Sequence, residues 1–270
     1  MKEINGQFIM DCCAPDDPNR LDHPDQLVAL LRSVGFLPLF SASIPGFSVE
    51  EHIPPDRWWT GDEDDPWEWR HTLASNSEIA YGKFFAGKAG FIHKDWFPVF
   101  ASFRRNGYDF DALWNDELAP QKWKKAMDLL DLDDCLIGKP IPASSISEER
   151  IKTDLEMRTY LIISDFEQKR NKRGIPYGLP HAILETPETK WGYDFVTSCY
   201  DEGWEKCWDR IKAQVQNLYP AADDKTIWSL LGMRILSADS VVAGIPGKAS
   251  KKASKKVPDT KPILKSIQKR

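Results

Sequence analysis

The stretch from residue 144 to residue 186 constrains the fold of this chain more than any other. It opens with SSISEERIK, which favours a short helix, and continues with TDLE, Thr153 to Glu156. A threonine followed three residues later by a glutamate is the capping-box pattern that begins a helix, so a longer helix is expected from Thr153 to Gly174. The run IPYGLPHAILETPE then predicts two short extended segments. Short helix, long helix and hairpin, in this order, indicate a winged-helix-like unit.

Helical spacing of apolar residues recurs outside this stretch. HPDQLVALLRSVGF predicts a helix that ends at Gly35, and Pro66 is expected in the first turn of another. Further helices are expected over DALWNDE, APQKWKKAMDLLD, YDFVTSCYDEGWEKCWDRIKAQVQNLYP and DDKTIWSLLG, the last capped by Asp224. The runs IAYGKFF and KAGFI flank Ala86-Gly87 and predict a β-hairpin. The sequence therefore predicts an α+β, helix-dominated fold with winged-helix-like units and short β-hairpins.

Charge and composition divide the chain into three regions. Residues 244–270 carry eight lysines and one arginine against one acid, a net charge of about +8. Because the whole chain has a net charge of −5, residues 1–243 carry about −13. We expect an N-terminal Trp-rich helical region with a β-hairpin at 1–138, a winged-helix-like region with C-terminal helices at 139–243, and a disordered lysine-rich tail at 244–270. A basic tail on an acidic body is common in proteins that contact nucleic acid. A tail that only increases solubility is the alternative.

Several classes of protein find no support in the sequence. No apolar run approaches the roughly 20 residues of a membrane span, and the N-terminus lacks a signal peptide, so a cytoplasmic protein without membrane contact is expected. Five cysteines without a CxxC pair argue against a disulfide framework or a zinc ribbon. The acids of GDEDDPWE lack the spacing of a calcium loop. We expect neither a metal nor a cofactor, and no nucleotide-binding or hydrolase motif occurs.

Clustered cations indicate where a phosphate backbone would bind. QKRNKRG holds four of them, at the expected end of the long helix: Lys169, Arg170, Lys172 and Arg173. Cations favour helix C-termini through the helix dipole, but four exceed what the dipole explains. Phosphate contact is therefore expected at this run.

A second group of cations lies in GKFFAGKAGFIHKDWF. Lys83, Lys88 and Lys94 flank the turns of the expected hairpin and can reach phosphate. The aromatic residues between them are expected to pack inward: Phe84, Phe85 and Phe91. The alternative is a scaffold segment whose lysines only face water.

Four longer phrases resemble one known family. DPWEWRHTLASNSEIAYGKFFAGKAGFI, WFPVFASFRRNGYDFDALW, TDLEMRTYLIISDFEQKRNKRGIPYG and ETPETKWGYDFV resemble the AlkZ-related proteins, bacterial relatives of the AlkZ-type DNA glycosylases. The resemblance covers roughly residues 20 to 232 and leaves out the lysine-rich tail. It implies a winged-helix protein that faces double-stranded DNA, with repair of alkylated bases as the implied activity.

The catalytic motif of these glycosylases is not matched convincingly. They use a Gln-x-Gln or Gln-x-Asp pair to position water, and Gln214-Val215-Gln216 is the sole literal match. Residues two apart on a helix point to different sides, so this match is attributed to chance. Glu156 is the alternative group for activating water, although its place as the glutamate of the capping box is the preferred explanation, and Arg158 beside it adds a cation for DNA. Three hypotheses remain open: a monofunctional DNA glycosylase, a non-catalytic winged-helix DNA-binding or regulatory protein, and a scaffold for small molecules or proteins.

Overall fold

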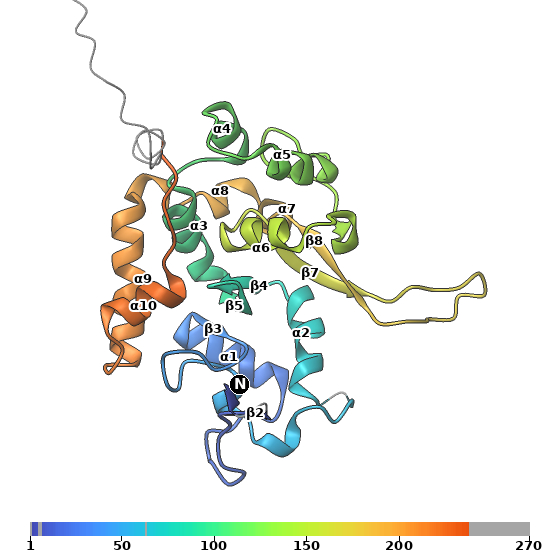
Figure 1. Cartoon of the computed structure of the whole chain (residues 1–270), viewed down its shortest axis with the longest axis vertical. Coiled ribbons are helices and arrows are strands. Elements are labelled where there is room, and N and C mark those ends of the chain that lie inside the picture. Colours follow the sequence, from blue (N-terminus) through green and yellow to red (C-terminus); the bar gives the residue numbers. More distant parts are fainter. Residues whose placement is uncertain (1, 5–6, 63, 238–270) are drawn as a thin grey trace, which may run out of the picture.

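The centre of the fold is a six-stranded antiparallel sheet (Figure 1). The computed structural model describes residues 2–4, 7–62 and 64–237, so the lysine-rich tail expected at 244–270 lies outside the described residues. The strands run in the order β3 (Phe36–Pro38), β5 (Lys88–His93), β4 (Ile79–Phe85), β7 (Ile162–Glu167), β8 (His181–Glu185) and β6 (Ile141–Pro142). A separate hairpin is formed by β1 (Lys2–Ile4) and β2 (Gln7–Ile9).

Helices outweigh strands, at 45% against 14% of the residues, which confirms the α+β, helix-dominated class. Their bounds are α1 (Pro24–Val34), α2 (Pro66–Ser75), α3 (Phe97–Arg105), α4 (Phe110–Asn115), α5 (Gln121–Met127), α6 (Glu149–Met157), α7 (Pro187–Trp191), α8 (Tyr193–Val196), α9 (Trp204–Leu218) and α10 (Asp224–Leu231). In the part of the chain that the structure describes, no helix is both long and apolar enough to cross a bilayer.

The hairpin expected around Ala86-Gly87 is confirmed as β4 and β5. Both turn residues have positive φ, 50° at Ala86 and 80° at Gly87, as a two-residue type I′ turn requires. Phe84, Phe85 and Phe91 are all fully buried, as expected. The turn residues and the buried side chains of the two strands therefore both agree with the predicted hairpin.

The buried apolar side chains form two clusters. The larger joins β3, β4 and β5 to α1, α2, α3 and α9, and the smaller packs α4, α5 and α6 against β6 and β8. Helix α3 is buried along its whole length, including two consecutive arginines, Arg104 and Arg105. The sheet and the smaller cluster both contain residues from either side of residue 138. The division of the chain into two regions at residue 138 stays a prediction.

The longer helix predicted from Thr153 to Gly174 is wrong. Helix α6 begins at Glu149, with Glu148 at its N-cap, and ends at Met157, so Thr153 lies inside the helix and caps nothing. After a turn in which Thr159 has a φ of 63°, residues Ile162–Glu167 form β7 between β4 and β8. β-branched residues suit a strand with neighbours on both sides, and this pairing overrides the local capping signal. The cap expected at Asp224 is instead Asp223, whose side chain accepts from the Thr226 N–H.

Candidate nucleic-acid interface

A long arm connects β7 to β8 and extends away from the body (Figure 1). We call residues 168–180 the basic arm; all of them are exposed. Its two sides are joined by backbone hydrogen bonds, from the Asn171 N–H to the Ile175 carbonyl at 2.9 Å and from the Tyr177 N–H to the Lys169 carbonyl at 2.8 Å. The arm is therefore a narrow antiparallel ribbon that continues the β7–β8 hairpin.

The four cations predicted to contact phosphate all lie on the basic arm: Lys169, Arg170, Lys172 and Arg173. No acidic residue occurs between residues 168 and 180, so the arm carries four positive charges. Arg170 donates to the Gly174 carbonyl at 3.0 Å, and among the described residues no carboxylate pairs with any of the four. Cations that are not neutralised by the protein itself remain available to an anionic partner.

Three large apolar side chains also lie exposed on the basic arm, and the sequence interpretation did not single them out. Ile175 is 54%, Tyr177 53% and Leu179 89% exposed. Residues two apart on an extended strand share one face, so the i, i+2 spacing of IPYGL was a signal for them. Large exposed apolar groups gathered beside free cations are typical of a binding surface, because water solvates the cations but not the apolar groups.

The lysines of the β4–β5 hairpin are less available than those of the basic arm. The Lys83 ammonium pairs with Glu149, and the Lys94 ammonium lies 3.6 Å from a Glu78 carboxylate oxygen. Lys88 is exposed next to the turn. Of these three predicted phosphate ligands, two are already ion-paired.

Arg158, the other predicted cation, is half-buried at the end of α6. Its guanidinium lies 5.3 Å from the Trp123 ring and donates to the Arg234 carbonyl at 3.1 Å. Burial lowers the pKa of Arg158, and Arg234 adds to this by repulsion. These contacts connect α6 to α5 and to the chain after α10.

The sheet separates the predicted cations into two groups. Strands β4 and β7 are antiparallel, with Tyr81 opposite Ile163. The Ala86-Gly87 turn and Lys88 therefore lie at one end of the sheet, and the basic arm leaves the other end. The structure does not bring Lys88 and the four arm cations onto one surface.

Glu156 is 2% exposed, between α6 and β4. Its Oε2 accepts a hydrogen bond from the Lys83 backbone N–H at 2.7 Å. Burial raises the pKa of Glu156 to about 7, although the Lys83 N–H favours the ionised form. A carboxyl that titrates near neutrality can exchange a proton, but this one is enclosed by protein, so its catalytic role stays a prediction.

The two glutamines of Gln214-Val215-Gln216 face different neighbours on α9. Gln214 donates to the Val34 carbonyl at 3.0 Å, whereas Gln216 donates to Asp224 Oδ1 at 2.7 Å, and Val215 between them is buried. Their divergence agrees with the expectation that they cannot share one water molecule.

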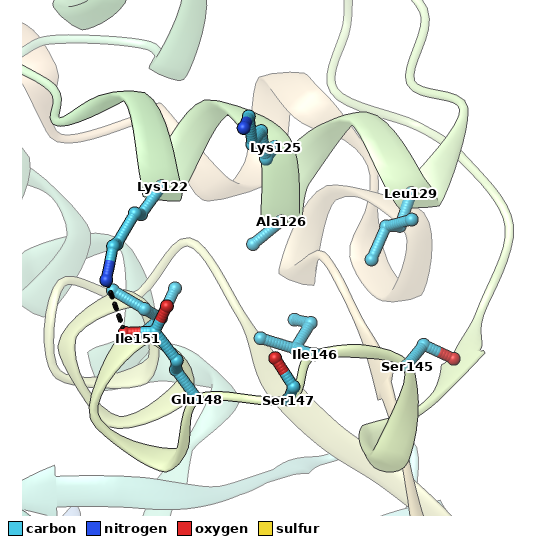
Figure 2. Close-up of a pocket in the computed structure, with 9 residues that line it drawn as sticks. All are labelled: Lys122, Lys125, Ala126, Leu129, Ser145, Ile146, Ser147, Glu148 and Ile151. Carbon is cyan, nitrogen blue, oxygen red and sulfur yellow. Dashed lines mark hydrogen bonds and ion pairs between the residues drawn. The ribbon is translucent and has the colours of Figure 1, made fainter.

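A hollow of about 170 Å³ lies between α5 and the start of α6. Figure 2 shows Lys122 reaching across it from α5 to Glu148, where the two side chains form an ion pair at 2.8 Å. Ala126 and Ile146 form part of its apolar lining. Because Glu148 neutralises Lys122, this hollow is a weaker candidate for phosphate than the basic arm.

The comparisons with known proteins give one result. A family model described as AlkZ related matches residues 21–232. No curated protein and no solved structure matches the chain. The matched residues cover more than half of the chain, from before α1 to just after α10, and they include the sheet and the basic arm. The chain therefore belongs to the AlkZ-related family, as its sequence phrases predicted.

Proposed function

We propose that this protein binds double-stranded DNA through the basic arm. The observation that carries the proposal is the projection of four unpaired cations and three exposed apolar side chains on one hydrogen-bonded ribbon. A two-stranded β-ribbon fits the major groove of B-DNA, and cations along it can contact the phosphates on either side. Membership of the AlkZ-related family supports a DNA partner.

The experiment removes the charge of the arm and measures affinity for duplex DNA by fluorescence anisotropy. The variant K169Q/R170Q/K172Q/R173Q should bind about 10- to 100-fold more weakly at roughly 100 mM salt. Each lost phosphate contact also removes about 0.9 from the slope of log affinity against log salt, so the slope should flatten by about 3 to 4.

A matched control removes four charges elsewhere on the full chain. Lys122, Lys125, Lys139 and Lys206 are exposed, and their change to glutamine lowers the net charge equally. This control should change affinity less than about threefold, since general attraction falls with distance. Equal losses in both variants would show that net charge, rather than the arm, attracts DNA. Absence of binding by the unchanged protein at low salt would favour the scaffold hypothesis.

Lys83, Lys88 and Lys94 remain candidates for a secondary contact. Because Lys83 and Lys94 already have carboxylate partners, K83Q/K88Q/K94Q should weaken binding less than about fivefold. A loss as large as that of the arm variant would move the main DNA contact to the β4–β5 hairpin.

Hydrolysis of the N-glycosidic bond of an alkylated base, with Glu156 activating water, is the catalytic form of this proposal. Its support is a carboxyl with a pKa near 7 in a protein of this family. Release of base from alkylated DNA by the unchanged protein, lost in E156Q, would support it. No release above a heat-inactivated control would leave non-catalytic DNA binding.

A further inference from the structure

A pocket of about 390 Å³ lies at the base of the basic arm. Its wall includes Ser164 and Glu167 of β7, Glu185 of β8 and Lys190 of α7. Glu167 immediately precedes the arm, so the pocket lies where the arm joins the sheet. We call this site the Lys190 pocket.

The Lys190 nitrogen is held by two backbone carbonyls. Nζ donates to the Ala74 carbonyl at 2.7 Å and to the Ile79 carbonyl at 2.9 Å. A neutral amine has two N–H groups, and these two bonds use both. The remaining tetrahedral position then carries the lone pair, and the pocket that Lys190 lines is where a ligand can meet it.

The surroundings of Lys190 increase its share of free amine relative to an exposed lysine. Burial lowers the pKa of Lys190 to about 8, and it outweighs the opposing effects of Glu185 and Asp165. Burial also raises the pKa of Glu185, a residue only 9% exposed, while the charge of Lys190 and a hydrogen bond from Ser164 oppose that shift. Burial therefore destabilises the charged form of both groups, and each can exchange a proton with a bound ligand.

A helix-capping role explains only part of this arrangement. The Ala74 carbonyl belongs to the last turn of α2, where carbonyls lack intrahelical partners, and a lysine there satisfies it. Capping requires neither an adjacent buried carboxyl nor an open pocket. Both are present, and a lysine amine desolvated by burial is activated for attack on a carbonyl carbon.

We propose that Lys190 is a nucleophile that forms a Schiff base with a hydroxylated aldehyde entering this pocket. The lone pair of Nζ attacks the aldehyde carbon, a C–N bond forms, and the C=O π pair moves to oxygen. Glu185 relays the proton lost by nitrogen to that oxygen, which gives a carbinolamine. Protonation of the hydroxyl by the Glu185 carboxyl then releases water and leaves a protonated imine and a Glu185 carboxylate.

The pocket wall defines the class of aldehyde. Ser75, Ser77 and Ser164 offer hydroxyls, and Asp165 and Glu167 offer carboxylates, which suit the hydroxyl groups of a sugar. An open-chain deoxyribose has this chemistry, either free or as an abasic site in DNA. The abasic source rests on the proposed function, because the basic arm would bring the DNA to the pocket.

The test traps the imine with cyanoborohydride in the full chain and maps the reduced adduct by mass spectrometry. One arm supplies a duplex with a single abasic site, a second supplies free 2-deoxyribose, and a third supplies intact duplex. In one of the first two arms, Lys190 should be modified at least about tenfold more than the exposed Lys206, and intact duplex should give no adduct.

Matched variants separate chemistry from folding. K190R keeps donors for the two carbonyls but forms no imine, so the Lys190 adduct should vanish while circular dichroism stays unchanged; K206R should retain it. E185Q should slow adduct formation at least about tenfold and leave the fold intact, which covers the case in which K190R misfolds. Modification of Lys190 no greater than that of Lys206 in both aldehyde arms would overturn the proposal.

The source of the aldehyde can be distinguished from the reaction itself. Trapping by abasic duplex that is lost in the arm variant K169Q/R170Q/K172Q/R173Q supports both the DNA function and Lys190. Trapping by deoxyribose alone supports Lys190 and contradicts a DNA source. DNA binding without any Lys190 adduct supports the DNA function and overturns the Schiff base.

Discussion

Replacement of Arg105 with methionine should lower the free energy of unfolding by about 3–5 kcal/mol. Arg105 and Glu188 form an ion pair in which both side chains are 0% exposed. Arg105 also donates to the Thr159 and Tyr200 hydroxyls, both at 3.2 Å. Burial alone would lower the pKa of Arg105, but Glu188 and Tyr200 raise it, so the pair is ionised. Removal of the arginine leaves a buried carboxylate without its counter-ion.

Urea unfolding monitored by circular dichroism measures this loss. The double variant R105M/E188M removes both charges, so it should recover more than half of the stability lost in R105M. The exposed pair Lys139–Asp131 is the matched control, and K139M should change stability far less than R105M because water screens both charges. A double variant as unstable as R105M would show that packing, rather than the unpaired charge, causes the loss.

The second large effect is a pH dependence introduced by Glu156. Its pKa rises from 4.5 to about 7 in the folded chain, mainly through burial. Between these values the folded chain binds more protons than the unfolded chain, so the contribution of Glu156 to stability is complete below pH 4.5 and falls as pH rises to 7. Relative to E156Q, the wild-type protein should lose up to about 3 kcal/mol over this window.

Measurement of both proteins by urea unfolding from pH 4.5 to 8.5 isolates this effect, because other titrating groups cancel in the difference. Glu149, on the same helix, provides a control of opposite sign. Hydrogen bonds from Lys152 and Lys83 lower its pKa below 4.5, so the wild-type protein should gain stability relative to E149Q only as pH rises to about 4.5, and the difference should change little from pH 4.5 to 8.5. Glu149 is exposed, so that gain should be small. A difference between wild type and E156Q that does not change with pH would contradict a raised pKa at Glu156.

Elements with strong local signals were predicted from the sequence alone. Gly35 ends α1 and Pro66 begins α2, as their turn and cap chemistry required. Ala86-Gly87 predicted the β4–β5 hairpin, because a two-residue hairpin turn requires residues that adopt positive φ at both positions. The failure between Thr153 and Gly174 has a different cause, since β7 is stabilised by partners distant in sequence, β4 and β8. No local pattern contains that pairing.

The candidate site likewise has features that local sequence predicted and features that only the tertiary structure shows. Local composition identified Lys169, Arg170, Lys172 and Arg173 as a cationic run, but placed them at the end of a helix that does not exist. Their presentation on a projecting ribbon follows from the pairing of β7 with β8. The buried Arg104 and Arg105 were missed because adjacent arginines usually face water, and only the carbonyls and the carboxylate around them satisfy their charge.

The sequence by itself determined the helix-rich α+β class, the AlkZ-related family, the end of α1, the start of α2, the β4–β5 hairpin and the cationic run. These properties depend on residues close together in the chain, where spacing and turn chemistry act directly. Only the tertiary structure decided that β7 is a strand, that Glu156 is buried, and that Lys190 and Glu185 line one pocket. Each of these depends on contacts between distant segments, because burial and strand pairing arise only when the whole sheet is assembled.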